Sequence, residues 1–393
     1  MRGHYMEKFS VVLAGGGSKG IYQIGAWKGL KDMGVSFEAV AGTSIGAING
    51  AFMAQGDLKK ALAMWRNIRL DQCVNLPKEA DKLSANLLDW QHAGVIFREM
   101  IAHGGIDQSP LVSLLSSYID PARVFDSPID FGLCTYNLRN RSSLKIWKHD
   151  IPRERLFSYL LASSALPLLR QVKVGEDVFL DGGLADNLPF DMLRKKGFRN
   201  IIAMDIRGLR NRTVDTERLR ISHICNSQDL GGLLDVTPEL LERNYQLGIL
   251  DAKKTFGKYD GIHYYFPVKD YQYLLKSYND GVVPGLEDAA LLYEMPRDRV
   301  YSAEEFLDAL RSCKALAGEK YADVRQRLVD DGIISALRNG SLKNLKNLPS
   351  SMRLALLMEL IVEAKRNGSN WSIPLRYFRD MDHAAKALLH LDM

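Results

Sequence analysis

FSVVLAGGGSKG, residues 9–20, is the stretch that decides the fold. Its apolar run, rich in valine and stopped by three glycines, predicts a short buried strand of a parallel sheet. The pattern then becomes helical over residues 18–33. Glycines between a strand and a helix leave backbone N–H groups uncovered, and a helix start favours negative charge. The stretch therefore predicts a site for an anion, either a bound phosphate or an oxyanion formed during a reaction.

The pattern of strand and helix is repeated directly afterwards, with a second strand at residues 35–41 and a second helix at residues 45–54. This alternation indicates an α/β fold with a central, mostly parallel sheet and helices on its faces. Ligands of such folds bind beyond the carboxyl ends of the strands. Residues 57–125 are predicted to be mostly helical, and further strands are predicted at residues 131–136, 143–147, 178–181, 201–206 and 261–268.

Two parts of the chain are expected. Residues 1–275 are predicted to form the α/β domain, and the composition becomes linker-like at residues 279–285. Residues 285–393 are predicted to be a helical C-terminal segment, in which Ser302 and Glu305 have the spacing of a capping box. This segment is either a helical cap on the main domain or a surface for a partner.

The composition is that of an ordinary globular protein, with 393 residues, 46% of them hydrophobic and 25% charged. The four cysteines form no CxxC pair, and no histidine spacing suggests zinc, so we expect a reducing compartment and no metal site. No apolar run approaches the roughly 20 residues of a membrane span. We therefore expect a cytoplasmic protein that touches membranes only from outside.

The small net charge of +5 is unevenly placed, because residues 191–220 hold nine basic against four acidic side chains. This segment is either a solvated loop and helix face or a patch for anionic head groups or a cofactor phosphate. The predicted strand at 201–206 would bring Arg207, Arg210 and Arg212 to the carboxyl end of the sheet, because parallel strands share one polarity. Peripheral membrane contact through this segment is therefore possible.

The glycine loop fits G-x-G-x-x-G, which is also the dinucleotide-binding pattern. That function needs an acidic residue near the end of the second strand to hold a ribose. The second strand ends instead in Ala41-Gly-Thr-Ser-Ile-Gly46, and Glu38 lies at its wrong end. The sequence also has no G-x-x-x-x-G-K-[ST] phosphate loop. These observations argue against a nucleotide, and no cofactor is predicted.

Residues 42–46, GTSIG, have the G-x-S-x-G pattern of a nucleophile placed on a sharp turn from strand into helix. Gly42 and Gly46 flank Ser44 because a Cβ at either position would collide with the neighbouring element. The preceding strand ends in the glycine loop, so two adjacent strand ends would bring a nucleophile beside a cluster of backbone donors. Acyl transfer needs that geometry.

A serine nucleophile needs a base, and none of the eight histidines has a recognisable catalytic setting. Asp181 ends the predicted strand at 178–181 and is followed by Gly182 and Gly183, so it is presented in the same way as the serine. Asp186 is close by, but its loop leads into Asn187, which suits the start of a helix. Ser142-Ser-Leu-Lys145 matches S-x-x-K but alternates like a strand, so we reject it as a catalytic motif.

Together, GGGSKG, GTSIG and DGG resemble the patatin-like phospholipase family in sequence and in order, and ASSALP at 162–167 and DGGLADNLP at 181–189 also look like family sequence. The resemblance covers residues 8–270 and implies a three-layer α/β/α fold. It implies Ser44 as nucleophile and Asp181 as base, in a Ser-Asp dyad. The implied oxyanion hole consists of Gly15, Gly16, Gly17 and Ser18. The implied supporting residues are Lys19, Gly20, Gly42, Gly46, Gly182 and Gly183, with Lys19 steadying the glycine loop.

By this resemblance the protein is expected to be a lipid acyl hydrolase of the phospholipase A or lysophospholipase type, acting through an acyl-serine. Its expected substrate is a phospholipid or another acyl ester, and no nucleic acid partner is expected. Two alternatives stay open. One is an acyltransferase that uses the same acyl-serine, and the other is a non-catalytic effector that binds lipid.

Overall fold

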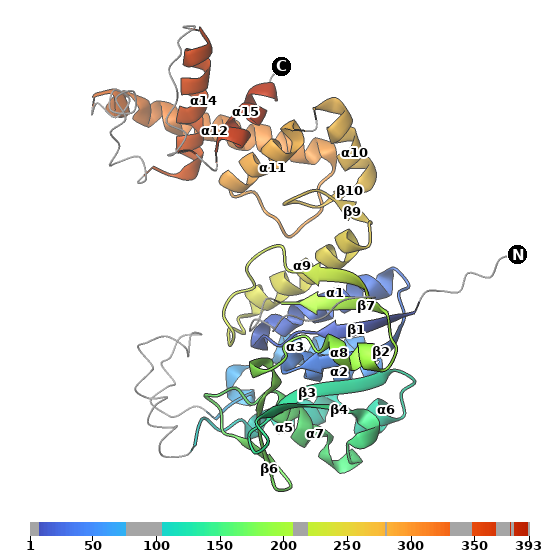
Figure 1. The fold of residues 1–393 in the computed structure, drawn as a ribbon. Coiled ribbons are helices and arrows are strands. Elements are labelled where there is room, and N and C mark those ends of the chain that lie inside the picture. The colour runs from blue at the N-terminus through green and yellow to red at the C-terminus, as the bar shows by residue number, and fades with distance from the viewer. Residues whose placement is uncertain are drawn as a thin grey trace, which may run out of the picture. The chain divides into compact units, whose positions relative to one another are not determined.

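The structure is a computed structural model that describes residues 8–75, 104–206, 219–279, 281–330, 348–366, 378 and 381–391 (Figure 1). The chain divides into two compact units, Met1–Phe256 and Gly257–Met393. Residues 257–275, expected to belong to the first domain, lie in the second unit, and Tyr264, Phe266, Tyr271 and Leu274 are part of its core. Which residues the functional domain needs stays a prediction.

An eight-stranded sheet forms the centre of the first unit. Its strands are β1 (Phe9–Leu13), β2 (Phe37–Thr43), β3 (Asp130–Asn137), β4 (Ser142–Trp147), β5 (Val172–Val174), β6 (Asp177–Asp181), β7 (Asn200–Asp205) and β8 (Arg220–Cys225). Their order is β5-β6-β3-β2-β1-β7-β8, with β4 also paired to β3. Strands β3, β2, β1, β7 and β8, in this spatial order, pair with their neighbours in parallel. Strands β4 and β6 are antiparallel to β3, and β5 is antiparallel to β6.

Helices cover both faces of this sheet (Figure 1). The α-helices are α1 (Ile21–Asp32), α2 (Ile45–Gln55), α3 (Leu58–Asn67), α5 (Ser109–Tyr118), α6 (Pro121–Phe125), α7 (Leu156–Ser163), α8 (Phe190–Lys195) and α9 (Pro238–Thr255). The 3₁₀ helices are η1 (Gly17–Gly20), η2 (Leu70–Gln72), η5 (Lys148–Asp150), η6 (Arg153–Arg155) and η7 (Gly182–Leu184). On β3, Phe131 faces Gly50 of α2 and Gly132 faces Met192 of α8. Because successive side chains of a strand point to opposite faces, α2 and α8 lie on opposite sides. The unit is therefore a three-layer α/β/α fold.

Helices α1 and α9 pack along each other because glycines allow their backbones to meet. A Cβ on Gly25 would lie 2.0 Å from the carbonyl oxygen of Tyr245, and a Cβ on Gly248 would lie 2.0 Å from that of Tyr22. Real Cβ atoms do not approach so closely, so larger residues here would force the helices apart.

The strands predicted at 9–14 and 35–41 and the helix predicted at 45–54 are confirmed to within two residues, and so are the strands that became β3, β4, β6 and β7. The helix predicted at 18–33 is formed by η1 followed by α1, which begins only at Ile21. The predicted strand at 261–268 is wrong. Two short antiparallel strands, β9 (Tyr259–Asp260) and β10 (Phe266–Pro267), stand there instead, in the second unit. Strands β5 and β8 were not predicted; both lie at the ends of the strand order, and only Arg220 of β8 belonged to the predicted basic segment.

The second unit is mainly helical and has its own apolar core. Its helices are α10 (Val268–Ser277), α11 (Val282–Leu292), α12 (Ala303–Asp330), α14 (Ser350–Arg366) and α15 (Asp382–His390). The capping box at the start of α12 is confirmed. The Ser302 N–H donates to Glu305 at 2.9 Å, and the Glu305 N–H donates to the Ser302 hydroxyl at 3.2 Å.

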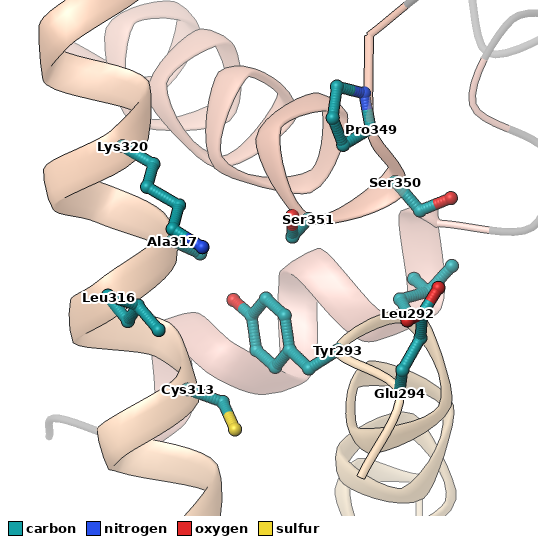
Figure 2. A pocket seen from close by; sticks show the side chains of 10 residues that line it. All are labelled: Leu292, Tyr293, Glu294, Cys313, Leu316, Ala317, Lys320, Pro349, Ser350 and Ser351. Atoms are coloured by element: carbon teal, nitrogen blue, oxygen red, sulfur yellow. The ribbon is translucent and has the colours of Figure 1, made fainter.

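A pocket of about 250 Å³ lies in the second unit, between α12 and the adjoining ends of α11 and α14 (Figure 2). Its walls are mostly apolar, with the ring of Tyr293 directed into the space between Ala317 and Ser351. None of the motif residues lies in it. In the parts of the chain that the structure describes, no helix combines the length and the apolar character that crossing a bilayer requires.

Candidate active site

Ser44 stands on the sharp turn between β2 and α2. Its backbone has φ 56° and ψ −128°, a conformation that a residue with a side chain adopts only under strain. A Cβ on Gly42 would lie 2.2 Å from the carbonyl oxygen of Gly46, and a Cβ on Gly46 would lie 2.4 Å from that of Leu13. The predicted reason for the two flanking glycines is therefore confirmed.

The backbone of this turn is held by Ser163, at the end of α7. The Ser44 N–H donates to the Ser163 hydroxyl at 2.8 Å, and that hydroxyl donates to the carbonyl oxygen of Cys134 at 2.7 Å. Ser163 is buried and supports the strained turn from the neighbouring strand and helix. Ser163 lies in the ASSALP stretch, but no role was predicted for it from the sequence.

Asp181 reaches the same place from the opposite direction. It ends β6, which is antiparallel to β3, so the prediction that Asp181 is presented in the same way as the serine is wrong in the direction of its strand. The register explains how the residues still meet: Thr43 is paired with Cys134 on β3, and the next residue, Thr135, is paired with Asp181. A Cβ on Gly182 would lie 2.3 Å from the carbonyl oxygen of Cys134, so a larger residue would push this turn away from β3.

Burial dominates the chemistry of Asp181, whose exposed fraction is 1%. It raises the pKa of Asp181 to about 6, although hydrogen bonding from the Ser44 hydroxyl and the Gly183 N–H opposes the rise. Oδ1 accepts from the Gly183 N–H at 2.7 Å. No group of the described residues meets hydrogen-bond distance and angle to Oδ2. The Ser44 hydroxyl thus lies near enough to Asp181 to lower the pKa of its carboxyl group, but its position is not fixed by an ordinary hydrogen bond to Oδ2.

The glycine loop lies against the serine turn, since a Cβ on Gly15 would be 2.9 Å from the Cβ of Ser44. Two of its N–H groups are used within the protein: Gly15 donates to Asn187 Oδ1 at 2.9 Å, and Ser18 donates to the carbonyl oxygen of Leu233 at 2.8 Å. Among the described residues, none accepts from the N–H of Gly16 or Gly17. Gly17 has φ +58°, and a Cβ there would lie 2.1 Å from the Leu233 oxygen.

Lys19 and Gly20 join this loop to α1 and α2. The Lys19 N–H donates to the carbonyl oxygen of Gly16 at 3.3 Å, while its half-buried ammonium forms no ion pair or hydrogen bond with the described residues. The carbonyl oxygen of Gly20 accepts from the side chain of Asn49 at 2.9 Å, and a Cβ on Gly20 would meet Ile45 at 2.5 Å. Any steadying by Lys19 therefore comes from its backbone.

The loop that follows Gly183 is fastened to both other motifs. Besides the bond from Gly15 to Asn187, the Thr43 hydroxyl donates to the carbonyl oxygen of Asp186 at 2.9 Å. The interpretation of Asn187 as a helix cap is wrong: α8 begins at Phe190, preceded by Pro189, without a side-chain cap. The Asn187 amide instead contacts the glycine loop.

Lys145, rejected above as a catalytic residue, holds this loop from β4. Its ammonium lies 2.5 Å from Asp186 Oδ2 and 2.5 Å from Asp191 Oδ1. Burial alone would lower the pKa of Lys145, but the two carboxylates raise it above its ordinary value. Burial also raises the pKa of Asp186, against the effect of Lys145. The two ion pairs tie β4 to this loop, and none of the described hydrogen bonds joins Asp186 to Ser44.

Arg207, Arg210 and Arg212 lie outside the described residues, and membrane contact through them stays a prediction. Of the basic side chains before them, Lys196 pairs with Asp130 and lies 4.0 Å from the ring centroid of Trp147, and Lys195 lies 3.3 Å from Asp191. In this described part of the segment, these two lysines are therefore engaged within the protein.

Comparison with known proteins gives one family. The model of the family described as patatin-like phospholipase matches residues 11–194, which include Ser44 and Asp181. Lysophospholipase NTE1 of Debaryomyces hansenii is 26% identical over 217 residues, which are 53% of this chain and 12% of that protein. Patatin-like phospholipase domain-containing protein 7 of Rattus norvegicus is 27% identical over 208 residues, which are 52% of this chain and 14% of that protein.

Patatin-like phospholipase domain-containing protein 6 of Homo sapiens is 27% identical over 206 residues, which are 50% of this chain and 13% of that protein. The alignments thus cover only 12% to 14% of the length of these three relatives. The crystal structure of VipD from Legionella pneumophila aligns with 98% of this chain and 85% of its own, with a TM-score of 0.38 and 14% identity.

Proposed function

Since residues 11–194 of this chain belong to the patatin-like phospholipase family, we propose that the protein is a lipid acyl hydrolase of the phospholipase A or lysophospholipase type. The observation that carries the proposal is the meeting of three features. Ser44 stands on a strained turn, a buried carboxylate of raised pKa lies beside it, and two N–H groups of the adjacent glycine loop have no acceptor among the described residues.

In the first step the ionised Asp181 accepts the proton of the Ser44 hydroxyl while the serine oxygen attacks the ester carbonyl. An ordinary aspartate, with a pKa near 4, is a weak base toward an alcohol. The raised pKa, about 6, makes Asp181 a stronger base that is still ionised at neutral pH. No described histidine hydrogen-bonds to Ser44 or Asp181, which supports a dyad in place of a triad.

The carbonyl oxygen becomes negative during this attack. The N–H groups of Gly16 and Gly17 are the donors proposed to hold it, because those of Gly15 and Ser18 already donate elsewhere. Ser44 also precedes the first residue of α2, so the helix start adds favourable potential for negative charge.

The tetrahedral intermediate then collapses, and the leaving alcohol takes the proton from Asp181. In the second half, Asp181 accepts a proton from water as the water oxygen attacks the acyl-serine. Collapse of this second intermediate returns the proton to Ser44 and releases the fatty acid. The dyad is then restored in its starting state.

A fluorophosphonate probe tests the nucleophile, since it labels an activated serine covalently. Wild-type protein should be labelled and Ser44→Ala should not. Ser164→Ala, which changes a half-buried serine next to Ser163, should be labelled like the wild type. Undiminished labelling of Ser44→Ala contradicts the proposal.

Incubation with mixed phospholipids, followed by mass spectrometry, tests the reaction. Free fatty acid is the expected product, together with lysophospholipid from a diacyl phospholipid or with the glycerol phosphodiester from a lysophospholipid. Acyl chains found on another lipid alcohol or on coenzyme A would establish the acyltransferase instead. Lipid binding without any product would establish the non-catalytic effector.

A further inference from the structure

We propose that Asp205, His223 and Cys225 form a zinc-binding site at the ends of β7 and β8. Each residue offers one ligand atom, and the three atoms all lie within 4.8 Å of one another. The site is separate from the proposed dyad, and the proposed reaction does not use it.

The pairing of the two strands explains why these side chains meet. In the parallel ladder, Asp205 is paired with Cys225, and Ala203 is paired with His223. Residues two apart on a strand point to the same face, and so do residues that are paired across neighbouring strands. His223, Cys225 and Asp205 therefore project from one face of a hydrogen-bonded ladder, which holds their backbones at constant spacing.

The distance between the two harder ligands suits a tetrahedral metal. His223 Nε2 and Asp205 Oδ2 are 3.4 Å apart. Zinc bonds of about 2.0–2.2 Å to nitrogen and oxygen, at a tetrahedral angle, place these two atoms about 3.4 Å apart. The pair thus needs no movement to share a metal ion. Half of the His223 side chain and about a quarter of the Asp205 side chain are exposed, so an ion can enter from solvent.

The chemistry of the three ligands selects the metal. A thiolate, an imidazole and a carboxylate together favour Zn²⁺ over Mg²⁺ or Ca²⁺, which prefer sets made of oxygen alone. Three protein ligands leave the fourth tetrahedral position to water or to a ligand from outside. Ligand spacings along the chain predicted no metal site. Here the third ligand precedes the His-x-Cys pair and comes from another strand.

The position of the site suggests what the metal does. Asp205 is followed by Ile206, whose side chain supports the glycine loop: a Cβ on Gly16 would lie 2.7 Å from Ile206 Cδ1. The segment after β8 supports the same loop from another side, because the carbonyl oxygens of Gly232 and Leu233 accept from the Ser18 hydroxyl and N–H. Zinc bridging β7 and β8 would therefore brace the two segments that support the glycine loop.

Metal binding to the full-length protein tests the proposal. Protein freed of metal by a chelator and kept reduced is titrated with Zn²⁺ against a chromophoric indicator. We expect His223→Ala and Cys225→Ser each to lose one equivalent of bound Zn²⁺, or to bind it with a Kd that is about 100-fold higher or more. This size is expected because even residues that only support ligands change metal affinity by about 10–100-fold. With Co²⁺ in place of Zn²⁺, the wild type should show a thiolate-to-cobalt absorption band that Cys225→Ser lacks.

Two variants serve as matched controls. His149 Nε2 lies 3.3 Å from Asp150 in an exposed histidine–aspartate pair, and among the described residues this pair has no cysteine beside it. His149→Ala therefore removes a similar pair that is not part of the proposed site. Cys313→Ser removes a cysteine that is outside the cluster. Both variants should bind zinc like the wild type.

A measurement on the wild type alone guards against misfolded variants. Zn²⁺ should slow the alkylation of Cys225 by iodoacetamide and should leave the alkylation of Cys313 unchanged. Peptide mass spectrometry measures both rates. Equal zinc stoichiometry and affinity in the wild type and both ligand variants would overturn the proposal. So would alkylation of Cys225 at the same rate with and without Zn²⁺.

Discussion

The side-chain oxygen of Asn187 accepts a hydrogen bond from the N–H of Gly15 at 2.9 Å, although the two residues are 172 positions apart in the sequence. The bond joins the loop after Asp181 to the glycine loop beside Ser44. Because the Gly15 N–H is used in this way, Gly15 anchors the loop, whereas the N–H groups of Gly16 and Gly17 have no acceptor among the described residues. We therefore propose that Asn187 is a positioning residue of the proposed oxyanion hole.

Asn187→Ala should lower kcat by about 10- to 100-fold with little change in KM, because loss of an oxyanion donor costs about 10²- to 10³-fold and a displaced loop costs less. Turnover of a short, soluble ester measures this. Asn137→Ala is the matched control, since both asparagines are 4% exposed and accept backbone N–H bonds, but Asn137 does so in the turn after β3. It should reduce stability and leave kcat unchanged. Equal kcat in folded Asn187→Ala and wild type would remove the positioning role.

Ser163→Ala should destabilise the protein and the serine turn together. The Ser44 N–H loses its acceptor in a buried place, which costs about 1–3 kcal/mol of unfolding free energy. We expect the strained turn to relax and fluorophosphonate labelling to slow at least about tenfold. Urea denaturation and labelling rates are the measurements. The adjacent Ser164→Ala, whose hydroxyl donates to the carbonyl oxygen of Leu160, should change neither the stability nor the labelling rate by much. If labelling of Ser163→Ala is as fast as that of the wild type, this support is dispensable.

The pH dependence of kcat/KM should report the ionisation of Asp181. The base must be ionised in the free enzyme, and burial raises its pKa to about 6. We expect kcat/KM to be constant above about pH 7 and to fall about tenfold per pH unit below about pH 5. Initial rates with an uncharged soluble ester, between pH 4.5 and 8.5, give the profile. A profile with no titration between pH 5 and 7 argues against Asp181 as the base.

Asp181→Asn should abolish turnover and yet stabilise the protein at neutral pH. The folded state disfavours the ionised carboxylate, so the pKa of Asp181 is about 6 in the folded protein, against an ordinary value of 3.8 for an aspartate in an unfolded chain. As pH rises from about 4 to about 6, the folded protein retains a proton that the unfolded chain has lost, and stability falls. The shift of about 2 pKa units corresponds to about 3 kcal/mol, all of it lost above the folded pKa.

The amide variant carries no such charge and avoids this loss. Urea denaturation should therefore find Asp181→Asn more stable than the wild type by up to about 3 kcal/mol at pH 8, with the difference shrinking toward pH 4. A stability difference that is the same at pH 4 and pH 8 would refute the explanation by burial of the charge.

Much of the first unit was predictable because its signals are local. An apolar run before Gly15 predicts a buried strand from neighbouring residues alone, and the strain at Ser44 was predictable from the two glycines that flank it. The same is true of the capping box at Ser302, whose partners are three residues apart. Edge strand β8 was missed because its polar residues, among them His223, carry no local signature of a strand.

The sequence by itself determined which residues stand at the strand ends: the glycine loop, Ser44 and Asp181, each in a backbone turn that only its own neighbours allow. Only the tertiary structure decided how they combine. The register across β3 brings Asp181 to Ser44 from an antiparallel strand. Contacts with Asn187 and Leu233 decide which N–H groups of the glycine loop are used within the protein, and the pairing of β7 with β8 brings Asp205 to His223. The physical reason is that these partners are far apart along the chain, so their meeting depends on the order and register of the strands, which no local pattern contains.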